Sequence, residues 1–167
     1  ESDSNQRNQA IGALMLAYGY IKSNWQQAVD LYTRQCSIGV SAKDLAIMGA
    51  TLANLGVNPL TKKKVMNAND VPELLAVMAT AGFYDESGEW MYTAGLPTTA
   101  QLYYMYATGL PAKTGVGGGI VAVVPGKFAI AAFSPRLNEA GNSVRSLNAI
   151  RDIAGELGVG VFGPNPE

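Results

Sequence analysis

Two short apolar runs on either side of a tight turn constrain the fold of this chain more than any other feature. The runs are Gly119 to Val124 and Phe128 to Phe133, and Pro125-Gly126-Lys127 separates them. Strand-forming runs joined by a turn of this length predict an antiparallel hairpin. The chain is therefore expected to build an antiparallel sheet with helices packed on it.

Helices are predicted on both sides of this hairpin in the sequence. From Asn8 to Ile21, apolar residues recur at the spacing of one face of an amphipathic helix. Further predicted helices run from Trp25 to Cys36, from a Ser41 cap to Gly56, and from an Asn69 or Asp70 cap to Gly82. A last helix is predicted after an Asn142 or Ser143 cap.

Between Gly82 and the hairpin the sequence changes character. Tyr84 to Gly88 has turn composition, in which Asp85 and Glu86 are expected to be solvated. Glu89 to Ala94 is rich in aromatic and strand-forming residues, which predicts that a strand begins there. The predicted order is helices, then sheet, then one closing helix.

Composition excludes several classes of function. The 167 residues are 48% apolar and 15% charged, which is typical of a single globular domain. A net charge of −1 gives no electrostatic footprint for nucleic acid, and no apolar stretch reaches the roughly 18 residues of a membrane span. The absence of histidine excludes Ser-His-Asp and Cys-His catalysis and any Cys/His zinc site within the chain. Proton transfer must therefore use Lys, Tyr or carboxylates.

Two further features bear on location and completeness. Cys36 has no partner in the chain, and the N-terminus lacks the layout of a signal peptide, so a cytoplasmic protein is expected. The chain starts at Glu1 without methionine, which raises the expectation that it is an excerpt of a longer protein.

Lys113-Thr114-Gly115, followed by Val116 and three glycines, leads directly into the first strand of the hairpin. In penicillin-recognising serine enzymes, Lys-Thr-Gly at a strand edge places an ammonium group and backbone N–H groups beside the reacting carbonyl. The tripeptide alone also admits another interpretation, in which the glycines only permit a bulge or tight turn. A phosphate-cradling loop is not favoured because the Walker spacing is absent.

Longer strings make the comparison specific. Read together in chain order, five blocks resemble the glutaminase family and span almost the whole chain. They are Leu31 to Ile38, Ala50 to Asn54, Gly82 to Gly88, Gly109 to Gly119 and Ser134 to Ser143. The resemblance implies an α/β fold of the serine β-lactamase kind, an antiparallel sheet flanked by helices, of which this chain is a C-terminal fragment.

The resemblance also implies a function. The family hydrolyses L-glutamine to L-glutamate and ammonia through a serine acyl-enzyme, and no metal or organic cofactor is implied. Residues 1–167 are expected to form a single partial domain, helical over 1–82 and with the sheet and closing helix over 83–167. The full-length enzyme is expected to be a homo-oligomer, a homotetramer, with L-glutamine as its ligand and neither nucleic acid nor membrane as a partner.

Five positions match the family's glutamine-binding residues. Glu1 and Asn8 are implied to recognise the polar groups of the substrate, the carboxylate of Glu1 holding the α-ammonium group. Tyr32 and Tyr84 match two active-site tyrosines, and Val116 matches a residue that binds through its backbone.

Local interpretations compete with these assignments. Without the family, Glu1 is an ordinary terminal carboxylate, Asn8 a helix cap and Tyr32 a core aromatic on a helix face. Tyr84 lies in a predicted turn, which suits a site residue better than a core residue. An ordinary phenol, whose pKa is about 10, is a poor base, so proton transfer by Tyr84 requires a nearby cation such as Lys113.

Two departures from the family pattern matter. The family's nucleophile lies in Ser-x-x-Lys, and no serine of this chain is followed by lysine three positions on. Met91 to Pro97 recurs as Met105 to Pro111, where the family has one Gly-Leu-Pro. The second copy leads into Lys113, so we expect it to keep the family's position and Thr98 to Tyr104 to bulge outward.

Two other functions stay open at this point. The chain can be a non-catalytic glutamine-binding or oligomerisation module, or a penicillin-recognising relative that acts on a different amide. Glutamine binding without turnover favours the first, and covalent labelling by a β-lactam favours the second. Without a nucleophile of its own, the isolated chain is expected to be inactive.

Overall fold

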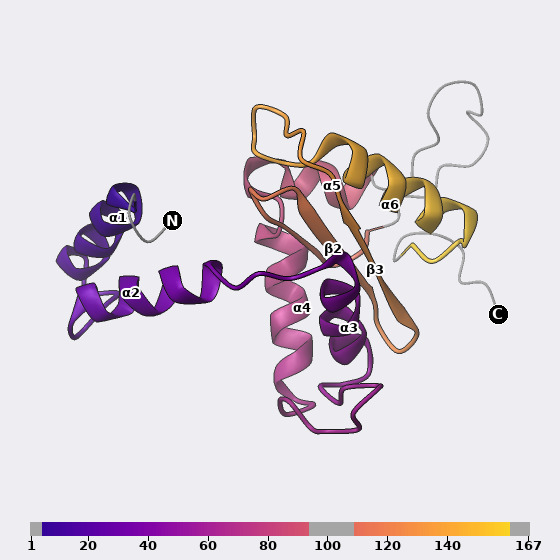
Figure 1. The fold of residues 1–167 in the computed structure, drawn as a ribbon, viewed down its shortest axis with the longest axis horizontal. Coiled ribbons are helices and arrows are strands. Elements are labelled where there is room, and N and C mark those ends of the chain that lie inside the picture. Colours follow the sequence, from indigo (N-terminus) through magenta and orange to yellow (C-terminus); the bar gives the residue numbers. More distant parts are fainter. Residues whose placement is uncertain (1–4, 94–108, 161–167) are drawn as a thin grey trace. The chain divides into compact units, whose positions relative to one another are not determined.

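Figure 1 shows a computed structural model of the chain, which describes residues 5–93 and 109–160. The chain divides into two compact units, Glu1–Val40 and Ser41–Glu167, and each is described by itself. The expectation of one partial domain over residues 1–167 stays a prediction. None of the helices in the described ranges is long and apolar enough to cross a membrane.

The first unit contains two helices, α1 (Gln6–Ala17) and α2 (Trp25–Cys36). Both predicted helices are confirmed, and α2 has its predicted bounds. α1 ends before the predicted Ile21, because Gly19 adopts a φ of +76° and the Ile21 N–H returns to the Met15 carbonyl. The side chain of Asn24 caps α2 by accepting a hydrogen bond from the Gln27 N–H.

A glycine lets these two helices approach closely. A Cβ atom at Gly12 would lie 2.5 Å from Val29 Cγ2 and 3.2 Å from the Trp25 ring. Asn5 Nδ2 donates a hydrogen bond to Thr33 Oγ1 at 2.9 Å and closes the other end of the contact. The helix pair is therefore held by one tight packing contact and one polar link.

The second unit is built on an antiparallel sheet with the order β1 (Ala112–Thr114), β2 (Gly119–Val124) and β3 (Phe128–Phe133). β2 and β3 pair along their whole length, from Gly119 opposite Phe133 to Val124 opposite Phe128. Gly126, with a φ of +75°, forms the turn. The predicted hairpin is confirmed with its predicted bounds.

Helices cover both faces of this sheet (Figure 1). α3 (Ala42–Ala53) and α4 (Asp70–Ala81) pack on the face that carries Val121 and Val123. α5 (Ser87–Thr93) and α6 (Val144–Glu156) pack on the face that carries Ile120, Ala122 and Val124. Consecutive side chains of β2 therefore enter two different cores, as the alternation of a strand requires.

The predicted helices of this unit are confirmed at α3, α4 and α6. Ser41 caps α3 in a capping box with Asp44, and Ser143 caps α6 by accepting from the Ser146 N–H. Asn69 occupies the N-cap position of α4 without a capping side-chain hydrogen bond. The two hydrogen bonds from Ser41 hold the pKa of the Asp44 carboxyl below its usual value, the hydroxyl contributing more than the backbone N–H.

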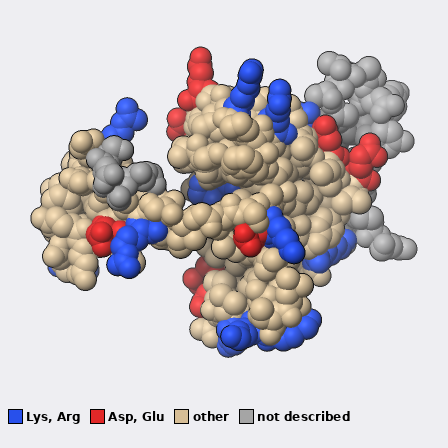
Figure 2. Space-filling view, in the orientation of Figure 1, with Lys and Arg blue, Asp and Glu red and all other residues tan. Residues whose placement is uncertain are grey.

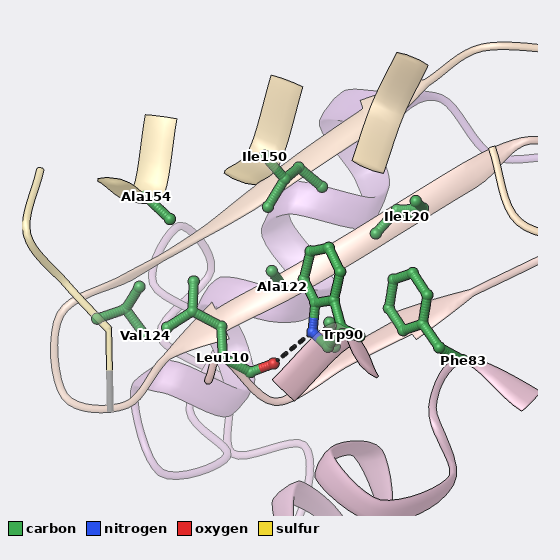
Figure 3. Close-up of a cluster of buried hydrophobic side chains, with 9 residues drawn as sticks. Phe83, Trp90, Leu110, Ile120, Ala122, Val124, Ile150 and Ala154 are labelled. Atoms are coloured by element: carbon green, nitrogen blue, oxygen red, sulfur yellow. Dashed lines mark hydrogen bonds between the residues drawn. The ribbon is translucent and has the colours of Figure 1, made fainter. Parts of the chain in front are cut away.

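The larger core lies between the sheet, α5 and α6 (Figure 3). Phe83 stacks on Trp90 with ring centroids 4.3 Å apart, and the indole Nε1 donates a hydrogen bond to the Leu110 carbonyl at 2.9 Å. Phe83, Leu110, Ile120 and Ile150 are fully buried, and each such side chain contributes about 1.5–3 kcal/mol. A smaller core between α3, α4 and β2 consists of Ala53, Val71, Leu75, Met78 and Val123.

The prediction of a strand over Glu89 to Ala94 is wrong. The short helix η1 (Tyr84–Glu86) and α5 occupy this part of the chain as far as Thr93. The Ser87 hydroxyl accepts from the Phe83 N–H and donates to the Tyr84 carbonyl, which fixes a helical turn at this point. Trp90 is then buried by packing on Phe83, and this tertiary contact overrides the strand propensity of the aromatic residues.

Two sequence features remain outside these elements. The predicted bulge at Thr98 to Tyr104 lies outside the described residues, as does most of the second copy of the repeated string. On the face that Figure 2 shows, Lys, Arg, Asp and Glu side chains are scattered among mostly uncharged residues.

Candidate active site

Tyr84 lies at the junction of α4 and η1, in a backbone conformation that is uncommon for a bulky residue. Its φ is +53°, in the left-handed region, and 44% of the residue is exposed. The Ser87 hydroxyl binds both sides of this position, at 3.0 Å from the Phe83 nitrogen and 2.8 Å from the Tyr84 carbonyl oxygen. The turn therefore presents the phenol at the surface from a fixed backbone.

Gly82 brings this turn against β1. The Thr114 N–H donates to the Gly82 carbonyl at 3.1 Å, and a Cβ atom at position 82 would lie only 1.8 Å from the Ala112 carbonyl oxygen. The exposed side chain of β1 is Lys113, and its ammonium nitrogen lies 4.9 Å from the centroid of the Tyr84 ring. An ammonium group at this distance from an aromatic face forms a cation–π contact. Lys113 Nζ also donates to the Thr114 carbonyl.

The loop between β1 and β2 forms a second side of the site. Gly115 N–H donates to Gly119 O at 3.0 Å, and Gly118 N–H donates to Gly115 O at 2.9 Å. Gly118 has a φ of +99°, and a Cβ atom there would lie 2.2 Å from the Ser134 carbonyl oxygen. Within the described part of the chain, the N–H groups of Val116 and Gly117 donate to no backbone carbonyl.

Gly141 lies beside both the Tyr84 turn and the loop between β1 and β2. A Cβ atom built on Gly141 would lie 3.6 Å from Tyr84 Cε2 and 3.7 Å from Val116 Cγ1. The two side chains thus approach one point next to this glycine, whose φ of +90° also favours a residue without a side chain. Tyr84 thus forms one exposed cluster with Lys113 and Val116, which are 29 and 32 residues further along the sequence.

The remaining predicted site residues lie in the other unit or outside the described residues. Tyr32 is on α2 and is 53% exposed, so its interpretation as a core aromatic is wrong. Asn8 is half-buried within α1, where the N-cap is Asn5, so its interpretation as a helix cap is wrong. Glu1 lies outside the described residues.

Sequence reasoning missed the role of Glu86. Asp85 is exposed, as predicted, but Glu86 is half-buried and accepts hydrogen bonds from Asn138 Nδ2 at 2.9 and 3.0 Å and from Asn142 Nδ2 at 2.6 Å. The prediction that Glu86 is a solvated turn residue is therefore wrong. Its partners are 52 and 56 residues away, so no local pattern could have revealed them.

This cluster has the parts of an acyl-transfer site. A tyrosine phenol can donate or accept a proton, and here an ammonium group lies over its ring. The N–H groups of Val116 and Gly117 are the kind of donors that stabilise an oxyanion. A nucleophile is the missing part, since Ser-x-x-Lys does not occur in the chain.

Solved structures share the fold of this chain. Among solved structures, the probable glutaminase YbaS superposes with a TM-score of 0.86 and 47% identity, over 97% of this chain and 48% of that chain. The Bacillus subtilis glutaminase YbgJ, solved as a covalent complex with 5-oxo-L-norleucine, gives a TM-score of 0.81 and 25% identity, over 96% of this chain and 52% of that chain.

Sequence comparison agrees with the structural one. A family model described as Glutaminase matches residues 1–102 and 99–162. A glutaminase of Bacteroides thetaiotaomicron is 47% identical over 165 residues, 99% of this chain and 47% of that protein. A glutaminase of Escherichia coli O81 is 48% identical over 162 residues, 97% of this chain and 48% of that protein.

The antiparallel sheet with helices on both faces, and Lys-Thr-Gly on the strand beside an exposed tyrosine, define a protein of the serine β-lactamase-like class. Within that class, the chain belongs to the glutaminase family. The expected fold class is thereby confirmed. The chain spans about half the length of the curated relatives it matches.

Proposed function

We propose that this chain supplies the substrate-binding half of a glutaminase, an amidohydrolase that converts L-glutamine to L-glutamate and ammonia through a serine acyl-enzyme. The observation that carries this proposal is the approach of the Tyr84 and Val116 side chains to one point beside Gly141, with the Lys113 ammonium group at the tyrosine ring. Family membership gives the substrate class.

In the proposed reaction, a serine Oγ attacks the carbon of the side-chain amide, and the amide oxygen becomes an oxyanion. Backbone N–H groups at Val116 and Gly117 suit the stabilisation of this charge. The C–N bond breaks as the leaving nitrogen takes up a proton, and ammonia departs. Water then attacks the acyl-enzyme, which releases L-glutamate and restores the serine.

Residues of this chain take defined roles in that scheme. Tyr84 moves the proton, and the Lys113 ammonium group lies at its ring. The carboxylate of Glu1 holds the α-ammonium group of the substrate, and Asn8 and Tyr32 bind its other polar groups. The serine and its lysine have to come from sequence other than these 167 residues.

Location and assembly form a second part of the proposal. A cytoplasmic location is supported by the lone Cys36, which is exposed and carries no disulfide. Assembly into a homotetramer rests on the family resemblance. Size-exclusion chromatography with light scattering on a protein that contains both halves tests the assembly.

The activity is tested with a chimaera in which the N-terminal half of the Escherichia coli glutaminase is joined to Glu1. We expect ammonia release from L-glutamine by the chimaera and none by the isolated chain, because binding and oxyanion groups cannot replace a nucleophile. Binding of glutamine without turnover in the chimaera favours a non-catalytic binding module instead. Covalent labelling by a β-lactam, without turnover of glutamine, favours a penicillin-recognising relative.

A further inference from the structure

Glu86 connects two segments that are distant in the sequence. Its two carboxylate oxygens accept three hydrogen bonds, at 2.9 and 3.0 Å from Asn138 Nδ2 and at 2.6 Å from Asn142 Nδ2. Asn142 Nδ2 also reaches the Phe83 carbonyl at 3.4 Å. η1, which begins with Tyr84, is thus bound through Glu86 to the loop 138–142.

The loop 138–142 is itself closed by hydrogen bonds. Asn138 N–H donates to Asn142 O at 2.8 Å, Asn142 N–H donates to Asn138 Oδ1 at 2.9 Å, and Gly141 N–H donates to Asn138 O at 3.1 Å. An isolated β-bridge between Leu137 and Ser143 closes its base. These hydrogen bonds fix Gly141 relative to Asn138 and Asn142, the two residues that bind Glu86.

Gly141 is the residue of this loop that faces the site. A Cβ atom built on its backbone would lie 3.6 Å from Tyr84 Cε2 and 3.7 Å from Val116 Cγ1. The other end of the loop is tied to the Val116 side as well, since Ser143 Oγ donates to Ser146 Oγ and Ser146 Oγ donates to the Gly118 carbonyl at 3.3 Å. Glu86 thus ties the tyrosine to the same loop whose Gly141 lies beside Val116.

Stability alone does not account for this cluster. Asn142 is fully buried, and both acceptors bound by its Nδ2 fix the orientation of the amide, so its Oδ1 has no hydrogen-bond partner among the described residues. A buried polar atom in that state is destabilising. This unpaired oxygen offsets part of the stabilisation that the hydrogen bonds to Glu86 contribute.

We propose that Glu86 is a positioning residue, which acts through Asn138 and Asn142 to hold the Tyr84 ring against Gly141 and Val116. The consequence for catalysis rests on the proposed glutaminase function, while the consequence for the structure does not. Glu86 touches none of the reacting groups in this assignment. It sets the place from which Tyr84 transfers its proton.

Glu86→Gln tests the proposal with almost no change in shape. Glutamine keeps one acceptor oxygen but presents an NH2 group to the amide donors of Asn138 or Asn142, so donor faces donor. Asp85→Asn is the matched control, since it removes the same charge from the exposed neighbouring residue. Asn138→Ala provides a second variant, which removes two of the three hydrogen bonds to Glu86 and also the Oδ1 acceptor of the Asn142 N–H.

The first measurement uses the 167-residue chain and needs no turnover. Nuclear Overhauser effects from the Gly141 α-protons to the Tyr84 ring and to the Val116 methyl groups report the geometry directly. We expect the Tyr84 contact to be lost in Glu86→Gln and in Asn138→Ala, and to be retained in Asp85→Asn. Retention of the Tyr84 contact in both Glu86→Gln and Asn138→Ala overturns the proposal. If one of these variants does not fold, the presence or absence of the contact in the other variant decides.

The second measurement uses the chimaera with the Escherichia coli N-terminal half. A misplacement of about 1 Å at a catalytic group lowers the rate by about 100-fold, so we expect kcat to fall by about 10- to 100-fold in Glu86→Gln with little change in KM. If Asp85→Asn lowers kcat as much as Glu86→Gln does, the loss of activity is due to the removed charge, and the proposal is overturned. A wild-type chimaera without turnover counts against the proposed function, and the nuclear Overhauser result then decides on Glu86.

Discussion

The indole nitrogen of Trp90 and the carbonyl oxygen of Leu110 lie 2.9 Å apart and form a buried hydrogen bond across 20 residues of sequence. Figure 3 shows this bond between α5 and the residues that lead into β1. The bond fixes the position of Leu110, two residues before β1, relative to α5.

Replacement of Trp90 by phenylalanine is predicted to destabilise the chain by about 2–4 kcal/mol. The change leaves the buried Leu110 carbonyl without its donor, which costs about 1–3 kcal/mol, and it removes part of a core aromatic ring. Urea unfolding followed by circular dichroism measures the difference. A loss below 1 kcal/mol contradicts a structural role for this hydrogen bond.

Deletion of residues 92–105 is predicted to maintain or raise stability. The deletion joins Met91 to Tyr106 and leaves one copy of the repeated string. The entropic cost of closing a loop grows only logarithmically with its length, at about 0.6 kcal/mol per doubling. The longer chain therefore carries a small free-energy penalty, which the deletion removes. Thermal unfolding of the deletion variant is the measurement, and loss of folding would show that the extra residues are an integrated part of the sheet.

Gly82→Ala is predicted to be strongly destabilising, by more than about 3 kcal/mol. The added Cβ would lie 1.8 Å from Ala112 O and 2.3 Å from Met78 O, and both of these atoms belong to the backbone. Gly88→Ala in α5 is the control, because its Cβ meets nothing within 4 Å and alanine favours a helix by about 1 kcal/mol. Opposite signs of the two changes in unfolding free energy support the close approach of α4 to β1.

The contribution of Asp44 to stability is predicted to depend on pH. Hydrogen bonds from Ser41 lower the pKa of this carboxyl in the folded state below the unfolded value of 3.8. A lowered folded-state pKa means that the stabilisation is complete above the unfolded value and is lost as the pH falls through the folded value. The melting temperature of the parent minus that of Asp44→Ala is therefore expected to be constant from pH 5 to 7 and to shrink below about pH 4. A difference that does not change over this range contradicts the prediction.

Tyr84→Phe and Asn8→Ala are predicted to have different kinetic effects in the chimaera. The first removes the proposed proton-transfer group and is expected to lower kcat by about 100-fold or more. The second removes a proposed contact to the bound substrate and is expected mainly to raise KM. Steady-state ammonia release measures both parameters, and equal changes of kcat and KM in the two variants speak against the assigned roles.

Local patterns determined much of what the sequence could predict. The hairpin and α2 have their predicted bounds, because strand-forming runs around Gly126 and an Asn24 cap act over short distances. The helix α5 was not predictable in this way. Whether its aromatic residues form a strand or a helix depends on Phe83 and Leu110, which contact Trp90 only in the folded chain.

The family resemblance predicted only those site residues that match the family's sequence pattern. That resemblance pointed to Tyr84 and Val116, which the structure brings together beside Gly141. It did not point to Glu86, whose partners are set by tertiary structure alone. Side chains that bind substrate recur in a family pattern, whereas a residue that holds another in place is found only from contacts.

The left-handed backbone of Tyr84 has a consequence for engineering. A bulky residue with a φ of +53° is strained by about 1–3 kcal/mol, whereas asparagine adopts this conformation more readily. A directed-evolution screen that scores heat resistance alone therefore rewards Tyr84→Asn, and in doing so removes the phenol. Screening rounds on the chimaera that alternate heat challenge with an assay of ammonia release from L-glutamine are expected to keep position 84 unchanged and to direct thermostabilising substitutions to other parts of the fold.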